Sequence, residues 1–210
     1  MMRHDLTGVV LAGGRSERFG SDKRIALLDG ASLLDRAVAI LREVAPRVLV
    51  SLARGEPAVA GLEAARDDRP DAGPLAGIAA GLRAASTPLC AFLPVDMPLV
   101  PPALLLALAD AAGDRGAVVD DGRGIQPLVA VYPRSLLPLA EEALARGERA
   151  VHRLALRANA AALGPDALRA FGDPDRFLLN VNTPDDLRET ASRPRAGQGR
   201  APRAPRLPPR

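Results

Sequence analysis

The stretch Gly8–Lys23, GVVLAGGRSERFGSDK, decides how the rest of the sequence is interpreted. It opens with Val9-Val10-Leu11, a short apolar run of the kind that forms a buried strand. Ala12-Gly13-Gly14 then let the backbone approach a ligand closely, and two arginines and Lys23 add fixed positive charge. The stretch therefore predicts a loop that wraps a polyanion at the end of a strand. Lys23 stands out because it is the only lysine among the 28 Lys and Arg residues.

The spacing of this loop differs from the two common phosphate-binding patterns. Lys23 is followed by Arg24 rather than Ser or Thr, and Gly13 and Gly14 are adjacent, so neither GxxxxGK[ST] nor GxGxxG fits. The chemistry is still available, because bare amides can reach phosphate oxygens while Arg18 and Lys23 neutralise charge on a leaving pyrophosphate. The competing interpretation is a plain glycine turn with solvated arginines.

Composition divides the chain into a body, residues 1–190, and a tail, residues 191–210. Apolar residues make up 48% of the chain, which is enough for one sizeable core. The tail carries six arginines and no acidic residue, so the net charge of +3 leaves −3 for the body. A mildly acidic body in a chain with 2% aromatic residues argues against nucleic-acid binding. The tail is rich in Pro and Arg without apolar periodicity, so we expect it to be disordered.

The cysteine count and the apolar runs bear on cellular location. Cys90 is the single cysteine, which excludes an intrachain disulfide and is typical of a reducing compartment. No charged and then apolar leader precedes Val9, and no apolar run reaches membrane-spanning length. We therefore expect a cytoplasmic protein that binds no membrane.

Apolar periodicity predicts alternating strands and helices. Strands are expected at 7–11, 47–52, 62–66, 89–95, 116–120, 127–132 and 177–181, and helices at 32–45, 102–112, 134–146, 149–158 and 165–171, with another beginning at Gly73. This order, with helices long enough for crossovers, indicates an α/β fold on a mostly parallel sheet. In such sheets ligands bind beyond the carboxyl ends of the strands, so the loops that follow strands form the candidate site.

Two of these loops carry oxygen ligands. Asp96 follows the most apolar strand, and Mg²⁺ favours one or two carboxylates together with phosphate and water oxygens. Asp96 could instead cap the next helix, since prolines follow it. Asn180 and Asn182 alternate along the end of the expected strand 177–181, which predicts that they point to opposite sides. Thr183-Pro184 then predicts the start of a helix.

A third loop has features suited to a purine base. Gly73, Gly77 and Gly81 recur at four-residue spacing and would share one bare face of a helix. Close packing of helix on sheet explains Gly81, while Gly73 and Gly77 could let a purine lie against the backbone. Asp67 precedes them, and a carboxylate can accept both N1–H and N2–H of guanine, a donor pair that adenine lacks. Asp68 beside it offers the same chemistry.

The pattern LAGGxxxRxGxDK after an N-terminal strand resembles the signature of nucleoside-monophosphate transferases, and within these the chain is most similar to the molybdenum cofactor guanylyltransferase family. Further segments match this family in order across residues 8–187: 73–78 (GPLAGI), 94–98 (PVDMP), 126–128 (QPL), 147–149 (GER) and 180–184 (NVNTP). The resemblance implies a three-layer, Rossmann-like α/β/α nucleotidyltransferase domain. It also implies transfer of GMP from GTP to the phosphate of molybdopterin, with Mg²⁺ as cofactor, release of pyrophosphate and no protein nucleophile.

The resemblance further implies roles for individual residues. It implies catalytic roles for Arg18, Lys23 and Asp96, and a metal-proximal role for Asn182. Nucleotide contacts are implied for Leu11, Ala12, Gly13, Gly14, Lys23, Ser51, Asp67, Gly73, Gly77 and Asp96. Candidates for the pterin side are Gln126, Arg149 and Asn180, for which plain surface solvation is the alternative.

The chain departs from the family after its second strand. A polar residue, often Asn, usually appears there twice, whereas here Ser51 is followed by Ala53, which weakens the case for strict guanine recognition. The alternatives are a related cytidylyltransferase, another nucleotidyltransferase such as one for sugar phosphates, or a non-catalytic nucleotide-binding adaptor for molybdoenzyme maturation. The LAGG and GPLAG segments count against the first of these, and the short half after residue 130 counts against the second. Retention of Lys23, Asp96 and Asn182 together counts against the third. A molybdoenzyme or another cofactor-biosynthesis protein is a candidate partner.

Overall fold

A seven-stranded sheet lies at the centre of the fold, and strand β1 (Leu6–Leu11) is third in its order β5-β4-β1-β6-β8-β7-β9. The computed structural model describes residues 2–12, 22–67, 69 and 73–192. The other strands of this sheet are β4 (Arg47–Leu52), β5 (Glu63–Arg66), β6 (Leu89–Pro94), β7 (Ala117–Asp120), β8 (Ile125–Pro133) and β9 (Ala161–Leu163). Only β8 runs antiparallel to its neighbours, so the prediction of a mostly parallel sheet is confirmed.

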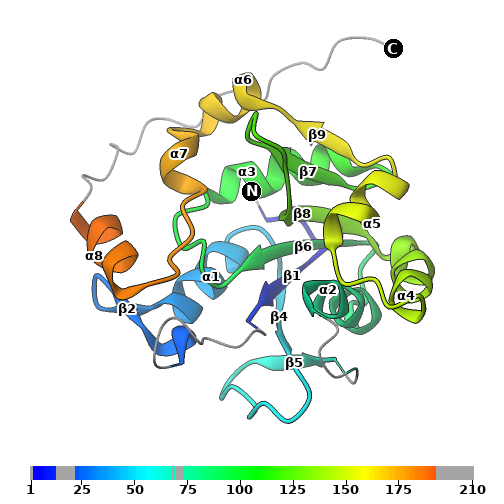
Figure 1. Cartoon of the computed structure of the whole chain (residues 1–210), viewed down its shortest axis with the longest axis horizontal. Coiled ribbons are helices and arrows are strands. Elements are labelled where there is room, and N and C mark those ends of the chain that lie inside the picture. The colour runs from blue at the N-terminus through cyan, green and yellow to red at the C-terminus, as the bar shows by residue number, and fades with distance from the viewer. Residues whose placement is uncertain (1, 13–21, 68, 70–72, 193–210) are drawn as a thin grey trace.

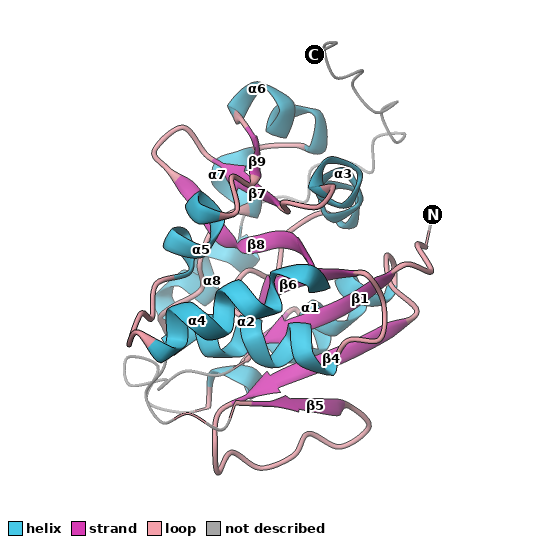
Figure 2. Cartoon of the chain, turned by 90° about the vertical axis from the view of Figure 1, so that its right-hand side faces the viewer, coloured by secondary structure: helices cyan, strands magenta, loops and turns pink. Residues whose placement is uncertain are grey.

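Helices cover both faces of this sheet, which gives three layers (Figure 1). Successive side chains of a strand point to opposite faces. In β1, Leu6 and Val10 therefore belong to one buried core, and Val9 and Leu11 belong to the other. The first core is covered by α1 (Leu33–Arg42) and α3 (Pro102–Ala112), and the second by α2 (Gly73–Ala84), α4 (Leu137–Ala145) and α5 (Val151–Arg157). Figure 2 shows α2 and α4 against one face of the sheet.

Local signals in the sequence explain where α1 begins. Asp29 and Gly30 both have positive φ angles, +49° and +81°, and they join the two-residue strands β2 (Leu27–Leu28) and β3 (Ala31–Ser32) in a tight hairpin. Ser32 then caps α1, because its hydroxyl accepts a hydrogen bond from the Asp35 N–H at 3.0 Å.

The close packing predicted for Gly81 is also confirmed. A Cβ at this position would lie 2.7 Å from the Phe92 ring and 3.0 Å from Val9, so only glycine lets α2 approach the sheet this closely.

The strand predicted at 177–181 is wrong. Phe177 ends the short helix α7 (Pro174–Phe177), which Asp173 caps by accepting a hydrogen bond from the Asp175 N–H at 3.1 Å. The run is apolar because Phe177 and Val181 are buried in the core. Its backbone nevertheless pairs with no strand of the sheet. The edge strand that pairs with β7 is β9, which was not predicted, because three residues of Ala-Ala-Leu carry little strand preference.

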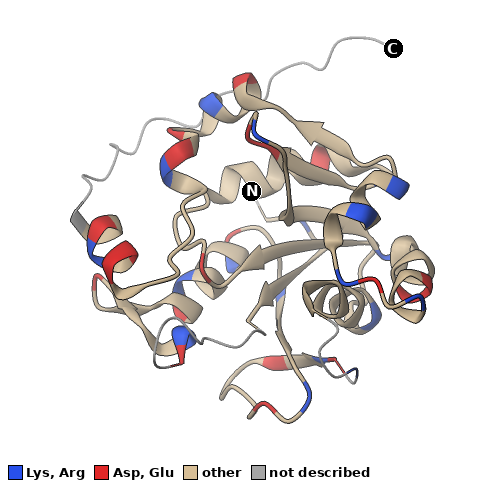
Figure 3. Cartoon of the chain, in the orientation of Figure 1, with Lys and Arg blue, Asp and Glu red and all other residues tan. Residues whose placement is uncertain are grey.

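Helix α8 (Pro184–Ser192) begins as the sequence predicts and follows α6 (Pro165–Leu168) and α7 in the chain. Thr183 Oγ1 accepts the Asp186 N–H at 3.1 Å, while Asp186 Oδ2 accepts the Thr183 N–H at 2.8 Å. This reciprocal pair is a capping box, and acidic residues in the first turn favour the helix dipole (Figure 3). Because α8 continues to Ser192, residues 191 and 192 of the predicted tail are helical; residues 193–210 lie outside the described part of the chain. Among the described residues, no helix has the length and apolar character needed to cross a membrane.

Candidate active site

The carboxyl ends of three adjacent parallel strands are level, and they form the floor of the candidate site. Leu11 of β1 pairs in register with Ser51 of β4 and with Pro94 of β6. Backbone contacts continue one residue further, since the Ala12 N–H bonds the Ser51 oxygen at 3.3 Å and the Val95 N–H bonds the Leu11 oxygen at 3.1 Å. The loops that leave these strands therefore start side by side, as the parallel topology requires.

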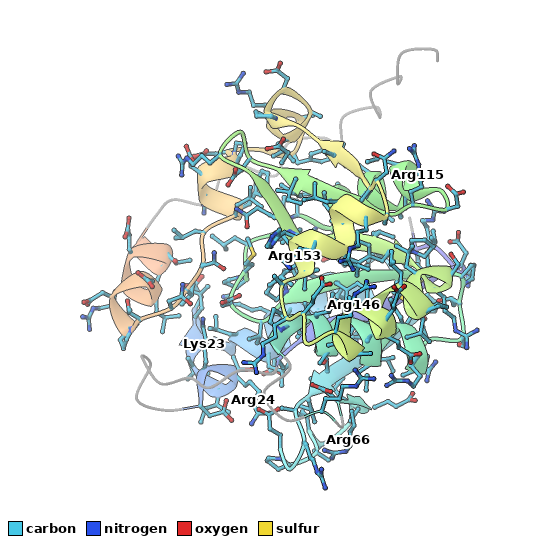
Figure 4. All side chains as sticks on the ribbon, turned by 45° about the vertical axis from the view of Figure 1, so that its right-hand side comes forward. Lys23, Arg24, Arg66, Arg115, Arg146 and Arg153 are labelled. Atoms are coloured by element: carbon cyan, nitrogen blue, oxygen red, sulfur yellow. The ribbon has the colours of Figure 1, made fainter. Side chains whose placement is uncertain are left out.

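Lys23, Asp96 and Asn182 meet at this edge of the sheet. Lys23 opens the 3-10 segment η1 (Lys23–Ile25), and its Nζ donates to Asp96 Oδ2 at 3.0 Å and to Asn182 Oδ1 at 2.8 Å. The Lys23 side chain is 13% exposed and that of Asp96 is 25% exposed. Three loops far apart in sequence thus place one ammonium group between a carboxylate and an amide oxygen. We call these three residues the lysine cluster; Figure 4 labels Lys23 beside Arg24.

Backbone hydrogen bonds, rather than a strand, bring Asn182 to Asp96. The Val181 N–H donates to the Asp96 carbonyl oxygen at 2.8 Å, which ties the segment after α7 to the loop after β6. The Asn182 N–H donates to Asp186 Oδ2 at 2.7 Å, and this bond is the main cause that lowers the pKa of Asp186, with a smaller contribution from the charge of Lys23. The prediction that Asn180 and Asn182 alternate along a strand end is therefore wrong. Asn180 is exposed, and Asn182 is the residue whose side chain contacts Lys23.

Ser51 and Asp67 occupy the other end of the floor, at the edges of β4 and β5. Both side chains are buried, at 3% and 9% exposure. A Cβ at Gly77 would lie 2.8 Å from Ser51 Oγ and 3.2 Å from Leu11, so Gly77 lets α2 pack directly on these strand ends. The Asp67 N–H bonds the Leu52 oxygen at 3.0 Å, and Asp67 Oδ1 accepts the Arg69 N–H at 2.9 Å.

Gly73 brings a pterin-side candidate next to the base-side candidates. Its φ of +67° favours glycine, and a Cβ there would lie 3.2 Å from the Arg149 Cβ. Arg149 is exposed and stands just before α5. The α4–α5 loop therefore passes directly over the start of α2.

Arg24 and Glu56 are two residues at this site that the sequence analysis missed. Arg24 clamps Asp22 through Nε, at 2.9 and 3.0 Å, and through a terminal nitrogen, at 2.7 Å. Its other terminal nitrogen lies 3.7 Å from Glu56 Oε2, and that oxygen accepts the Ala53 N–H at 3.0 Å. Glu56 thus bonds the backbone of the loop after β4 and also faces Arg24. The available signal was the pair of charged residues flanking the lone lysine.

Gln126 lies at the start of β8, which is antiparallel to β6 and so begins at the edge where β6 ends. Its Nε2 donates to Asp121 Oδ2 at 2.9 Å. Asp121 is a further residue that the sequence analysis did not single out.

Several predicted residues fall outside the described part of the chain. Gly13, Gly14, Arg18 and Asp68 are among them, so their predicted roles stay predictions. Leu11 and Ala12, at the described end of the same loop, are buried at 9% and 7% exposure.

The donor set of the lysine cluster suits a hard cation. Among the described residues, no group of three or more His, Cys, Asp or Glu side chains could hold a metal ion. Asp96 and Asn182 instead offer two oxygens, and an ammonium group already lies between them. Mg²⁺ usually takes only one or two protein oxygens and completes its shell with phosphate and water, so this pair fits such an ion.

The sheet, its level strand ends and the lysine cluster define a class of protein, a Rossmann-like α/β nucleotidyltransferase. Comparison with known proteins gives the particular family: residues 8–162 match the model of the MobA-like NTP transferase domain. The chain belongs to this family, as the sequence predicted. Nucleotidyltransferases of the family generally use a divalent metal ion.

Individual relatives cover nearly the whole chain. A probable molybdenum cofactor guanylyltransferase from Chloroflexus aggregans is 38% identical over 192 residues, which is 87% of this chain and 92% of the relative. One from Deinococcus radiodurans is 39% identical over 191 residues, or 90% and 95% of the two chains. A solved structure of molybdopterin-guanine dinucleotide biosynthesis protein A from Archaeoglobus fulgidus superposes with a TM-score of 0.73 at 26% identity, covering 88% of this chain and 96% of that one.

Proposed function

We propose that this protein transfers GMP from GTP to the phosphate of molybdopterin, with Mg²⁺ as the metal and pyrophosphate as the second product. The observation that carries the proposal is the lysine cluster at the level ends of β1, β4 and β6. It is supported by relatives named as molybdenum cofactor guanylyltransferases at 38–39% identity over most of the chain. An oxygen of the acceptor phosphate attacks the α-phosphorus of GTP, and the bond from that phosphorus to the oxygen bridging to the β-phosphate breaks.

Asp96 and Asn182 would hold the metal in this proposal. When bound, Mg²⁺ supplies charge neutralisation at the phosphate oxygens of the nucleotide. Lys23 has the same task from the protein side, since its ammonium lies between the two metal-facing oxygens and at the end of the Gly-rich loop. Positioning and charge account for the catalysis, and no side-chain nucleophile takes part. Cys90 is unsuited to such a role in any case, because burial raises the pKa of its thiol to about 12.

The guanine base would be recognised at the ends of β4 and β5. We assign the guanine N1–H and N2–H to Asp67, a carboxylate that can accept both donors, with Ser51, Gly73 and Gly77 alongside. Leu11, Ala12, Gly13 and Gly14 would follow the triphosphate, and Arg18 would share the charge of the leaving group with Lys23. We further propose that Gln126, Arg149 and Asn180 face the pterin side, and that the reaction takes place in the cytoplasm. The product would pass to a molybdoenzyme or to another protein of cofactor biosynthesis.

A product assay tests the proposal directly. The purified full chain is incubated with GTP, Mg²⁺ and molybdopterin, and the dinucleotide and pyrophosphate are measured in parallel. We expect equimolar formation of both, and omission of Mg²⁺ should abolish them. A thermal-shift series with GTP, CTP, ATP and UTP, each with Mg²⁺, tests the base. GTP should give the largest shift; a larger shift with CTP would overturn the guanylyl assignment in favour of cytidylyl transfer.

A further inference from the structure

The order of strands along the carboxyl edge fixes the direction from which a second substrate can approach. On the proposed function, the base lies at β4 and β5, and the reacting phosphate lies at β1 and β6, where Lys23 and Asp96 meet. The next strand in the sheet is β8. An acceptor that reaches the α-phosphorus from the side opposite the leaving group and the base therefore passes the beginning of β8, where Gln126 stands.

Gln126 has a fixed orientation, and its partner is Asp121. Asp121 Oδ1 accepts the backbone N–H groups of Arg123 and Gly124 at 2.8 and 3.0 Å, and its Oδ2 accepts Gln126 Nε2 at 2.9 Å. Burial raises the pKa of Asp121, but the Arg123 N–H and then the Gln126 amide more than offset this, so that the pKa is lowered overall. An ionised carboxylate only accepts hydrogen bonds, so the Gln126 amide must donate through nitrogen, and its oxygen is directed elsewhere.

The backbone around Gln126 is held as well. The pairing of β7 with β8 shifts from Val118 opposite Ala130 to Val119 opposite Gln126, so residues 127–129 form a bulge. The hydroxyl of buried Tyr132 donates to the Pro127 oxygen at 2.9 Å across this bulge. Bulges of this kind re-aim side chains next to functional sites. Gln126 is thus fixed through both its backbone and its side chain.

We propose that Asp121 is a positioning residue that makes Gln126 present its amide oxygen to the acceptor substrate. An amide oxygen accepts an N–H group and repels a phosphate, which would be recognised by the amide nitrogen, and one of the two N–H groups of that nitrogen is already given to Asp121. In this orientation the Gln126 oxygen is matched to the N–H-bearing edge of a heterocycle, such as the reduced pterin ring. This inference rests on the proposed function, since it names a contact to the second substrate of that reaction.

Asp121→Asn is the decisive variant, because it keeps the oxygen that closes the Arg123–Gly124 turn and replaces only the one that fixes Gln126. With an amide on both sides the Gln126 side chain can turn over and offer N–H to the substrate. We expect the KM for molybdopterin to rise roughly tenfold, the size expected from one hydrogen bond lost and replaced by a clash. The kcat and the KM for GTP should change less than about twofold.

Asp120→Asn is the matched control, since Asp120 lies in the same turn and its Oδ1 accepts the Gly122 N–H at 2.9 Å. It should leave both KM values unchanged. Gln126→Leu should reproduce the loss of Asp121→Asn, and the double variant should lose no more than either single one. An unchanged pterin KM in Asp121→Asn, an equal rise in Asp120→Asn, or additive losses in the double variant would overturn the inference while leaving the guanylyl transfer intact. A wild-type chain that forms no dinucleotide would count against the proposed function itself.

Discussion

Lys23 and Arg24 are neighbours in the chain, yet their charges are held in opposite ways. The Lys23 ammonium is a point charge placed between oxygens of two different loops, at 3.0 Å from Asp96 and 2.8 Å from Asn182. The Arg24 guanidinium is a planar fork that binds both oxygens of Asp22 and leans toward Glu56 at 3.7 Å. Hydrogen bonding to Asp22 raises the pKa of Arg24, and hydrogen bonding to Arg24 lowers the pKa of Asp22.

The difference separates a group that can change partners from a group that fixes geometry. A flexible ammonium can leave Asp96 and Asn182 when phosphate and metal arrive, because each partner supplies only one oxygen. A bidentate pair loses two hydrogen bonds at once if it opens, so it favours a single arrangement. Through Glu56, this pair also joins the loop after β1 to the Ala53 amide at the end of β4. We therefore expect Lys23 to act on turnover, and Arg24 with Glu56 to act on the alignment of the bound nucleotide.

Asp96→Asn should give the largest effect, since it removes the negative charge of the lysine cluster. Turnover should fall at least about 1,000-fold, the range seen when a principal electrostatic group of a phosphoryl-transfer site is lost. The fold should persist, because the contact with Val181 is made by the Asp96 backbone oxygen and not by its side chain. Steady-state rates at several Mg²⁺ concentrations, with a circular dichroism melt, measure both. A variant with near-normal turnover would remove Asp96 from the metal site.

Lys23→Ala should follow, with a fall in kcat of roughly 100-fold and a much smaller loss of GTP affinity. Lys23→Arg should not restore the rate, because a planar fork does not replace a point charge between two single oxygens. Single-turnover rates and GTP titration by calorimetry separate the two quantities. Equal losses in rate and affinity would mean that Lys23 only binds GTP. Full rescue by arginine would show that an ammonium group is not required at this position.

Glu56→Gln should have a smaller effect, and of a different kind. The amide oxygen of the variant can still accept the Ala53 N–H, but the charge facing Arg24 is lost. We expect the KM for GTP to rise about threefold with kcat nearly unchanged, and the free energy of unfolding to fall by less than about 1 kcal/mol. Arg54→Ala, which removes an exposed charge from the same loop, is the control, and it should change neither the KM for GTP nor the free energy of unfolding. A loss of kcat larger than the change in KM would contradict the alignment role.

Much of the lysine cluster could be predicted from the sequence, because the sequence signals that place its residues are local. Asp96 follows a continuous apolar strand, Lys23 closes a Gly-rich loop, and Thr183 begins a helix; each position is set by strand and cap rules that act within a few residues. The error lay in the apolar run 177–181, where Asp173 and Pro174 start a helical turn that composition alone does not reveal. Asn182 still reaches Asp96, through a backbone hydrogen bond of Val181 instead of a strand ladder.

The fixing contacts were not predicted, although they join residues close together in the chain, because turn geometry and not residue type decides which side chain accepts which N–H. Glu56 accepts the Ala53 N–H within a tight turn, in which the Glu56 N–H donates to the Ala53 oxygen at 3.1 Å. Asp121 fixes Gln126 across a turn whose register is set by a bulge, and a bulge leaves no clear pattern of alternation. Sequence patterns therefore locate groups that carry charge into a site more readily than groups that hold those charges in place.

Asp186→Asn should give the smallest effect, and it tests whether the charge of Asp186 stabilises the segment that carries Asn182. The backbone N–H groups of Asn182 and Thr183 and the charge of Lys23 lower the pKa of Asp186 in the folded protein. A carboxyl with a lowered folded-state pKa contributes stability that is present above its ordinary pKa, near 4, and is lost as the pH falls through the folded-state value. The midpoint of thermal unfolding should therefore be a little lower in the variant at pH 7, and the difference between the two proteins should shrink as the pH falls below about 4. Melts from pH 3 to pH 8 measure this, and a difference that grew toward acid would show that Asp186 does not stabilise the segment carrying Asn182 through its charge.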